Sequence, residues 1–303
     1  MPRKLILDVD TGTDDAVAIM LAALHPDLDL IGCTTANGNH DVERCTDNTL
    51  RVLNHIGRRD IPVYEGLRRP LARSEFPGPR FRHDIANPDF PLPATNLSKA
   101  DGGAVEYLIE TYRATTEEIT LVPVAPLTNI AAALALDPKF VDRVPEVIIM
   151  GGGHSLGNET PSAEFNIWCD PEAAAVVFRA GFRKITLVTL DATVQGKLTE
   201  LECHQLASSG SSAGRAVVDL IGQEVPIHDA VCVASIIDPE VISTRRLNVD
   251  VEVSGPLTVG RTVIDTRRHS DNVPNCDVAM GMSAARFARI VLETFAASSG
   301  QHA

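Results

Sequence analysis

Short apolar runs alternate with longer amphipathic segments along most of the chain. Residues 5–9 predict a buried strand, and the apolar spacing over residues 14–24 predicts a helix that stops at His25-Pro26. The alternation then continues with strand 28–35 and helix 42–56, strand 119–124 and helix 127–136, strand 146–150 and helix 171–180, and strand 184–190. Strands that alternate with helices in this way predict βαβ units around a mostly parallel sheet.

The rest of the chain adds helices, a few strands and one irregular stretch. Residues 199–239 predict helical segments, residues 247–253 and 262–265 look like a β-rich appendage, and a final helix begins at Ser283. Residues 68–99 contain six prolines and little periodicity, which predicts a loop that is either a lid or a plain surface excursion. The predicted fold is therefore α/β: an open, mostly parallel sheet flanked by helices, with a small β-rich C-terminal part. No repeat or boundary divides it, so we expect a single domain over residues 1–303.

The composition narrows the function classes. A formal net charge of −13 repels polyanions, and 4% aromatic residues are too few for a base-stacking platform, so no nucleic acid polymer is expected as a partner. Six scattered cysteines without a C-x-x-C pair predict buried thiols in a reducing compartment. Since no signal segment and no 18-residue apolar stretch are apparent, we expect a cytoplasmic protein with no membrane association.

Acidic residues follow the first predicted strand. Asp8, Asp10, Asp14 and Asp15 fall within eight residues, with Gly12 allowing a sharp turn. Four clustered carboxylates repel one another unless a hard cation neutralises them, so the pattern predicts a Ca²⁺ or Mg²⁺ site. The alternative, that Asp14 caps the helix and Asp15 favours its dipole, accounts for only one or two of the four.

Two further polar segments are ambiguous on their own. His228-Asp229 opens an apolar helical run, and such a dipeptide is more often a helix start than a catalytic pair. Glu164 and Asn166 precede the helix that begins near Asp170, where they offer either ligand contacts or an ordinary N-cap.

Together these segments resemble the inosine-uridine-preferring nucleoside hydrolase family. Its N-terminal signature D-x-D-x-G-x-D-D-A is matched by Asp8-Val9-Asp10-Thr11-Gly12-Thr13-Asp14-Asp15-Ala16. The likeness continues in the family's order through Asn39, residues 122–129, residues 150–153, residues 163–166, residues 170–174 and residues 228–230. It covers nearly the whole chain and implies a Rossmann-like nucleoside hydrolase fold.

The resemblance implies calcium-dependent hydrolysis of a ribonucleoside to ribose and free base. It assigns Ca²⁺ to Asp10, Asp15, Asp229 and the main-chain carbonyl of Val124, with Asp10 also the general base for a directly attacking water. A second group would bind the ribose: Asp14, Asn39, Asn158, Glu164 and Asn166, with Met150 packed in the same pocket. By the same resemblance the protein is expected to be a homodimer or homotetramer.

Less is implied about the leaving base. His228 would be its acid, and His83 would add a second imidazole, although the family's usual His-Gly and Asp-Gly pattern reads His83-Asp84-Ile85-Ala86-Asn87 here. Trp168 either stacks on the base or packs in the core. Purine or pyrimidine preference stays open.

Three other functions share part of this pattern. A haloacid-dehalogenase-type phosphatase would use Asp8 as nucleophile, but it needs a later Gly-Asp motif, and the chain has no Gly-Asp dipeptide. A calcium-bound nucleoside sensor would need neither a general base nor a leaving-group acid. A hydrolase of an unusual modified nucleoside agrees with every motif.

Overall fold

Nine strands form one sheet in the computed structural model, which describes residues 1–74 and 90–297. Their spatial order is β3-β2-β1-β4-β5-β6-β9-β7-β8, and every neighbouring pair from β3 to β9 is parallel, whereas β7 runs antiparallel to β9 and β8 antiparallel to β7. The strands are β1 (Arg3–Val9), β2 (Leu28–Thr35), β3 (Val63–Tyr64), β4 (Ile119–Pro123), β5 (Glu146–Met150), β6 (Ile185–Val188), β7 (Ile242–Val251), β8 (Thr262–Asp265) and β9 (Cys276–Met282).

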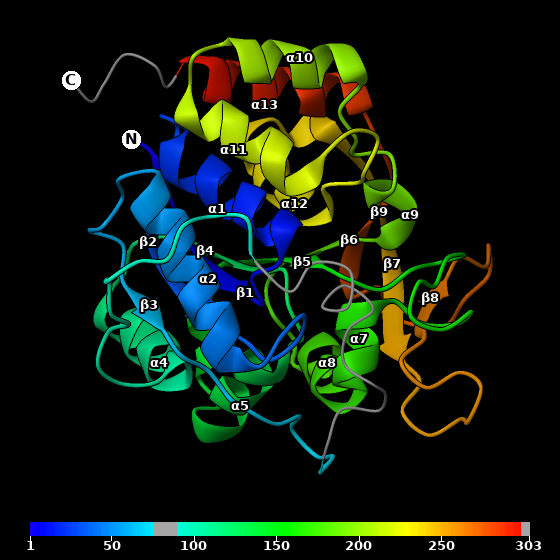
Figure 1. Cartoon of the computed structure of the whole chain (residues 1–303). Coiled ribbons are helices and arrows are strands. Elements are labelled where there is room, and N and C mark those ends of the chain that lie inside the picture. The colour runs from blue at the N-terminus through cyan, green and yellow to red at the C-terminus, as the bar shows by residue number, and fades with distance from the viewer. Residues whose placement is uncertain (75–89, 298–303) are drawn as a thin grey trace.

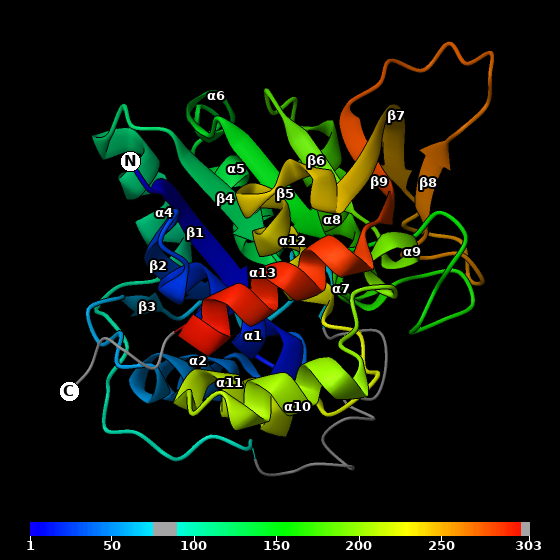
Figure 2. The same ribbon diagram turned by 90° about the horizontal axis from the view of Figure 1, so that it is seen from above.

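Helices cover both faces of the sheet (Figures 1 and 2). One layer contains α1 (Thr13–Leu24), α2 (Val42–His55), α10 (Glu200–Ser208), α11 (Ser212–Ile221), α12 (His228–Ile237) and α13 (Ala284–Ala297). The other contains α4 (Ala104–Ala114), α5 (Thr128–Leu136), α6 (Phe140–Arg143), α7 (Phe165–Cys169) and α8 (Pro171–Arg179). Two short helices, α9 (Leu190–Thr193) and η1 (Pro239–Val241), lie in connections.

The alternation of side chains along the strands divides the interior into two cores. In β1, Leu5, Leu7 and Val9 join the core beneath α1 and α12, whereas Ile6 points into the core beneath α4 and α5. Because successive strand side chains point to opposite faces, a strand buried on both sides is a continuous apolar run. This is the physical reason that the sequence pattern revealed these strands.

The predicted fold class is confirmed, with one correction at the C-terminus. The β-rich part is not an appendage, because β9 pairs in parallel with β6 and so extends the main sheet, and β7 joins it from the other side. The strand Cys276–Met282 and the helix Ala104–Ala114 were not predicted.

Two predictions from composition can be compared with the structure. All six cysteines are free and buried. None of the described helices is both long and apolar enough to cross a membrane. Within the proline-rich segment, residues 75–89 lie outside the described residues.

Candidate active site

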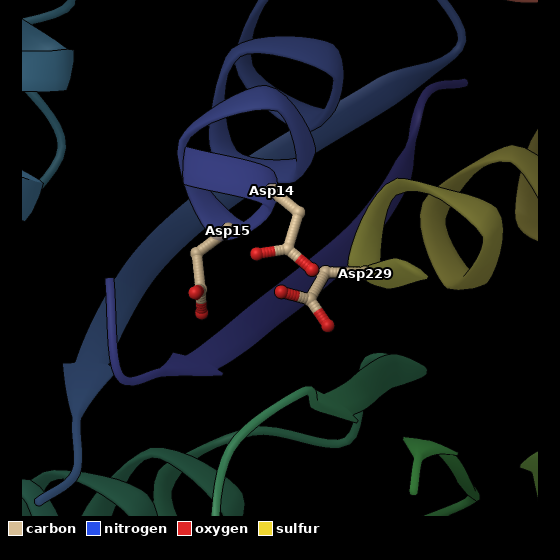
Figure 3. Close-up of side chains that lie close together, drawn as sticks. All are labelled: Asp14, Asp15 and Asp229. Atoms are coloured by element: carbon tan, nitrogen blue, oxygen red, sulfur yellow. The ribbon is translucent and has the colours of Figure 1, made fainter. Parts of the chain in front are cut away.

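The turn between β1 and α1 is held by Asp15. Its carboxylate accepts hydrogen bonds from the backbone N–H groups of Asp10 (3.1 Å) and Gly12 (2.9 Å), and the side chain is completely buried. Asp15, the third residue of α1, therefore takes the capping contact with the backbone of the N-cap residue Gly12, whereas the capping alternative gave the capping role to Asp14. Asp14 is left with its carboxylate directed away from the turn, toward Asp229 (Figure 3).

Asp10 is oriented by the loop that follows β2. The backbone N–H of Asn39 donates to Asp10 Oδ2 at 2.5 Å, and Asn39 Nδ2 donates to Asp15 Oδ2 at 3.3 Å. A Cβ on Gly38 would lie 2.0 Å from Asp10 Oδ2, so only glycine leaves room for this carboxylate. The predicted convergence of residues after β1 and β2 is thus observed.

A third carboxylate comes from a distant part of the sequence. Asp229, in the first turn of α12, points toward Asp14 and Asp15 at the start of α1 (Figure 3). Each of the three offers an oxygen atom, and these atoms all lie within 4.8 Å of one another. Asp15 and Asp229 are buried, and Asp14 is half-buried.

Burial and mutual repulsion raise the pKa values of Asp10, Asp15 and Asp229. Loss of hydration is the largest cause in each case: it raises the pKa of Asp15 to about 7, with Asp14 adding repulsion, and it raises those of Asp10 and Asp229 well above their ordinary values. A hydrogen bond from Asp229 to Asp15 offsets part of the rise for Asp15. Without a cation, the cluster therefore retains protons near neutral pH.

The donor set fits a hard divalent cation. Ca²⁺ takes six to eight oxygen ligands at about 2.3–2.6 Å, so two ligands on opposite sides of it are separated by about 5 Å. Oxygen atoms of Asp14, Asp15 and Asp229 within 4.8 Å of one another meet that requirement. The three carboxylates that converge include Asp14, whereas the resemblance names Asp10 as the third carboxylate ligand. Asp10 is connected to this group by Asn39, which donates hydrogen bonds to both Asp10 and Asp15.

Asn166 links the chain segments that follow β4 and β5. Its Nδ2 donates to the Val124 carbonyl at 2.9 Å, to the Met150 carbonyl at 3.3 Å and to Met150 Sδ at 3.5 Å. The structure thus brings together three of the predicted site residues at the ends of β4 and β5. The Val124 carbonyl retains a second lone pair for another partner.

Glu164 and Asn158 both take part in local backbone contacts. Glu164 is the N-cap of α7, and its oxygens accept from the N–H groups of Gly152 (2.8 Å), Asn166 (3.0 Å) and Ile167 (3.3 Å). Burial raises the pKa of Glu164 to about 7, and Asp14 adds repulsion. Asn158 is exposed, and its Oδ1 accepts from the N–H of Phe165 at 2.9 Å.

His228 begins α12 next to Asp229. Its Nδ1 lies 2.7 Å from the hydroxyl of Thr193, the last residue of α9. Burial lowers the pKa of the imidazole, while the negative charge of Asp14 opposes that change. The other predicted imidazole, His83, lies outside the described residues. Trp168 is half-buried in α7 with its backbone against Gly260.

Asp8 does not reach the site. It is completely buried, and its Oδ1 accepts from Thr34 Oγ1 at 2.5 Å and from Asn129 Nδ2 at 2.8 Å. A phosphoryl nucleophile must meet its substrate, so this placement argues against the phosphatase alternative. Asn129 also donates to the Thr35 carbonyl at 2.9 Å and thereby ties β1 and β2 together beneath the site.

Two polar residues that support the glycine loop after β5 were missed in the sequence. Asp191 accepts from the backbone N–H groups of His154 (2.7 Å) and Ser155 (3.0 Å). The Thr262 hydroxyl accepts from the N–H of Gly153 at 2.9 Å and donates to the Gly153 carbonyl at 2.7 Å. Asp191 follows β6, so extending the search for polar residues to that strand end would have found it; Thr262 gave no such signal.

The chain is similar to nucleoside hydrolases in sequence and in structure. It matches the inosine-uridine preferring nucleoside hydrolase family profile over residues 5–289. It is 38% identical to the pyrimidine-specific ribonucleoside hydrolase RihB of Escherichia coli (strain SE11) over 277 residues, 87% of each chain.

Two solved structures show the same likeness at the level of the fold. A plant nucleoside hydrolase, PpNRh1, superposes with a TM-score of 0.90 at 31% identity, covering 98% of this chain and all of the other. A purine-preferring ribonucleoside hydrolase from Gardnerella vaginalis superposes with a TM-score of 0.88 at 32% identity, covering 98% and 99%.

Proposed function

Because the chain belongs to the inosine-uridine preferring nucleoside hydrolase family, we propose that it hydrolyses the N-glycosidic bond of ribonucleosides with the aid of Ca²⁺. Family membership makes it a ribonucleoside hydrolase, with ribose and a free base as products. The observation that carries the mechanistic part is the convergence of Asp14, Asp15 and Asp229 within 4.8 Å, beside Asp10. Such a group binds a cation and stabilises positive charge on a sugar.

We assign the metal to Asp10, Asp15, Asp229 and the Val124 carbonyl, with Asp14 close enough to join them. When bound, Ca²⁺ offsets the repulsion among the carboxylates, orients the vicinal ribose hydroxyls and makes water more acidic. The raised pKa values of these carboxylates support this assignment, because burial and mutual repulsion disfavour their charged forms unless a cation is bound.

Asp10 is proposed as the general base. It receives a proton from the attacking water, whose oxygen forms the new bond to the anomeric carbon as the bond to the base nitrogen breaks. The hydrogen bond from the Asn39 N–H and the space at Gly38 hold one oxygen of this carboxylate in place. Direct attack by water predicts inversion at the anomeric carbon.

The ribose is proposed to lie between the carboxylates and Asn166. Asp14, Asn39, Asn158, Glu164 and Asn166 would contact its hydroxyls, and Met150 would pack against the ring. Positive charge develops on the sugar as the C–N bond breaks, so fixed carboxylates nearby stabilise the transition state more than the bound substrate. Glu164 keeps its position through three backbone hydrogen bonds.

His228 is proposed to protonate the leaving base. The electron pair of the broken bond stays on the base, and the imidazolium supplies the proton that neutralises it. Burial makes the imidazolium more acidic by lowering its pKa, which favours transfer. His83 is proposed as a second contact for the base. The sequence around His83 differs from the family pattern, so the preferred base is determined by the substrate panel below.

Two wider proposals follow the resemblance and the composition. The six free, buried cysteines support a reducing compartment such as the cytoplasm. A homodimer or homotetramer is proposed from the family resemblance, and sedimentation analysis tests it directly.

Ribose release measured by a reducing-sugar assay tests the function. The substrates are inosine, adenosine, guanosine, uridine and cytidine, each with calcium and with a chelator, and p-nitrophenyl phosphate serves as the phosphatase control. Release that depends on calcium supports the proposal. Binding of nucleosides without release of ribose would favour the sensor alternative. Neither binding nor release with any of the five would indicate a modified nucleoside as the substrate.

A further inference from the structure

The hydroxyl of Thr193 is hydrogen-bonded to the imidazole of His228. Thr193 is completely buried at the end of α9, and its Oγ1 lies 2.7 Å from His228 Nδ1. The first turn of α9 is anchored to the sheet, because Thr189 Oγ1 donates to the carbonyl of Ala279 in β9 at 2.9 Å. The position of the hydroxyl is therefore set by the core of the fold rather than by a surface loop.

The backbone around His228 is tied to the same segment. The N–H of Ile227 donates to the Gly196 carbonyl at 2.8 Å, so the residue before His228 is bound to the chain that follows α9. A Cβ on Gly196 would lie 2.8 Å from a methyl group of Val231 in α12, which shows how closely the two segments pack. Main chain and ring of His228 are thus both fixed by residues 193–196.

We propose that Thr193 is a positioning residue that orients His228 through Nδ1 and so presents Nε2 to the leaving base. The inference rests on the proposed function of His228. In the described part of the chain, Nε2 of this ring has no hydrogen-bond partner, whereas Nδ1 has Thr193. A hydroxyl is suited to this place because it accepts from Nδ1–H, with its own proton free to turn toward the Leu190 carbonyl at 3.5 Å.

His228 and the leaving base account for every proton that moves when the base departs. The imidazolium donates its Nε2 proton to the base as the bond between the anomeric carbon and the base nitrogen breaks, and the bonding pair stays on the base. The ring is left neutral, with its remaining hydrogen on Nδ1 directed at Thr193 Oγ1. Loss of the hydroxyl removes this partner and frees the ring to rotate about its side-chain bonds.

The test compares substrates that do and do not require a protonated leaving group. Wild type, Thr193→Val and Thr193→Ser are assayed on the best ribonucleoside and on p-nitrophenyl β-D-ribofuranoside, whose phenolate leaves without a proton. Since an error of about 1 Å in a catalytic group costs about 10²-fold, Thr193→Val should lower the ratio of nucleoside kcat to nitrophenyl riboside kcat by roughly 10- to 100-fold. Thr193→Ser, which keeps the oxygen, should restore most of that ratio.

A double variant shows whether Thr193 acts through His228. In a His228→Ala background, Thr193→Val should cause no further fall in the ratio, because the ring that Thr193 positions is already absent. An unchanged ratio in Thr193→Val, or an additive loss in the double variant, overturns the inference. If wild type releases no ribose from any nucleoside, the proposed function itself fails. Thr193→Ala replaces the valine variant if that variant does not fold, as judged by its thermal unfolding.

Discussion

Removing calcium should make the stability of this protein fall as the pH rises toward neutrality. In the metal-free protein, burial raises the pKa of Asp15 to about 7, whereas an unfolded chain leaves it near 3.8. The folded state therefore binds more protons than the unfolded state between these values. The resulting contribution to the free energy of unfolding is fully present below about pH 4 and is lost as the pH rises through 7.

The size of the effect follows from the shift. A difference of about three units at roughly 1.4 kcal/mol each corresponds to about 4 kcal/mol from Asp15. Asp10 and Asp229 shift in the same direction, so they add to this slope. About three quarters of the contribution from Asp15, roughly 3 kcal/mol, is lost between pH 4.5 and pH 7.5; at roughly 2 °C per kcal/mol for a chain of this length, the metal-free Tm should fall by about 6 °C or more across this window, while calcium should abolish most of the fall.

Thermal unfolding in chelator and in calcium, at four pH values across this window, measures the effect. Asp15→Asn should make the Tm in chelator less dependent on pH and should remove most of the rise in Tm that calcium causes. Asp27→Asn is the matched control, because Asp27 is exposed at the start of β2, the opposite end of the strand from the site, and this variant should behave as wild type. A metal-free Tm that does not fall with pH, or a calcium-induced rise in Tm that is equal at pH 4.5 and pH 7.5, would contradict this coupling between the carboxylates and folding.

Other predictions concern catalysis. Asp10→Asn should lower kcat by about 10²- to 10⁴-fold, the usual contribution of a general base, while calcium still raises its Tm; near-normal turnover would reject Asp10 as the base. Gly38→Ala should lower kcat at least about tenfold, because its Cβ would displace Asp10, whereas Gly281→Ala, whose nearest neighbour would be 3.5 Å away, should leave kcat unchanged. His228→Ala should impair nucleosides far more than p-nitrophenyl β-D-ribofuranoside, and equal losses on both would exclude leaving-group protonation.

The sequence predicted the parallel part of the fold because those strands are buried on both faces. Strand β9 was missed because Asp277 and Gly281 interrupt the apolar pattern that marks the inner strands, and the last three residues of β9 are only half-buried. Helix α4 was missed because Tyr107 and Tyr112, which pack it against the sheet and α6, are poor helix formers. In both cases tertiary packing, not the local pattern, decides the structure.

For the site, the sequence located what lies at strand ends close to the acidic signature. Asp10, Asp15 and Asn39 follow from the rule that parallel strands present their carboxyl ends to one edge. Asp229 is about 200 residues further along the chain, and only the resemblance connected it to that edge. Thr193 had no signal at all, since a threonine in a short helix is ordinary until the fold places it beside an imidazole.

The most direct test of the account is ribose release from ribonucleosides by the wild-type protein and Asp10→Asn, each with calcium and with chelator. The panel includes the 2′-deoxy analogues, which lack one of the two hydroxyls that a bound calcium would orient. We expect release by wild type with calcium only, a large preference for ribonucleosides, and almost no release by Asp10→Asn. Release that persists in chelator, or that survives in Asp10→Asn, would contradict it.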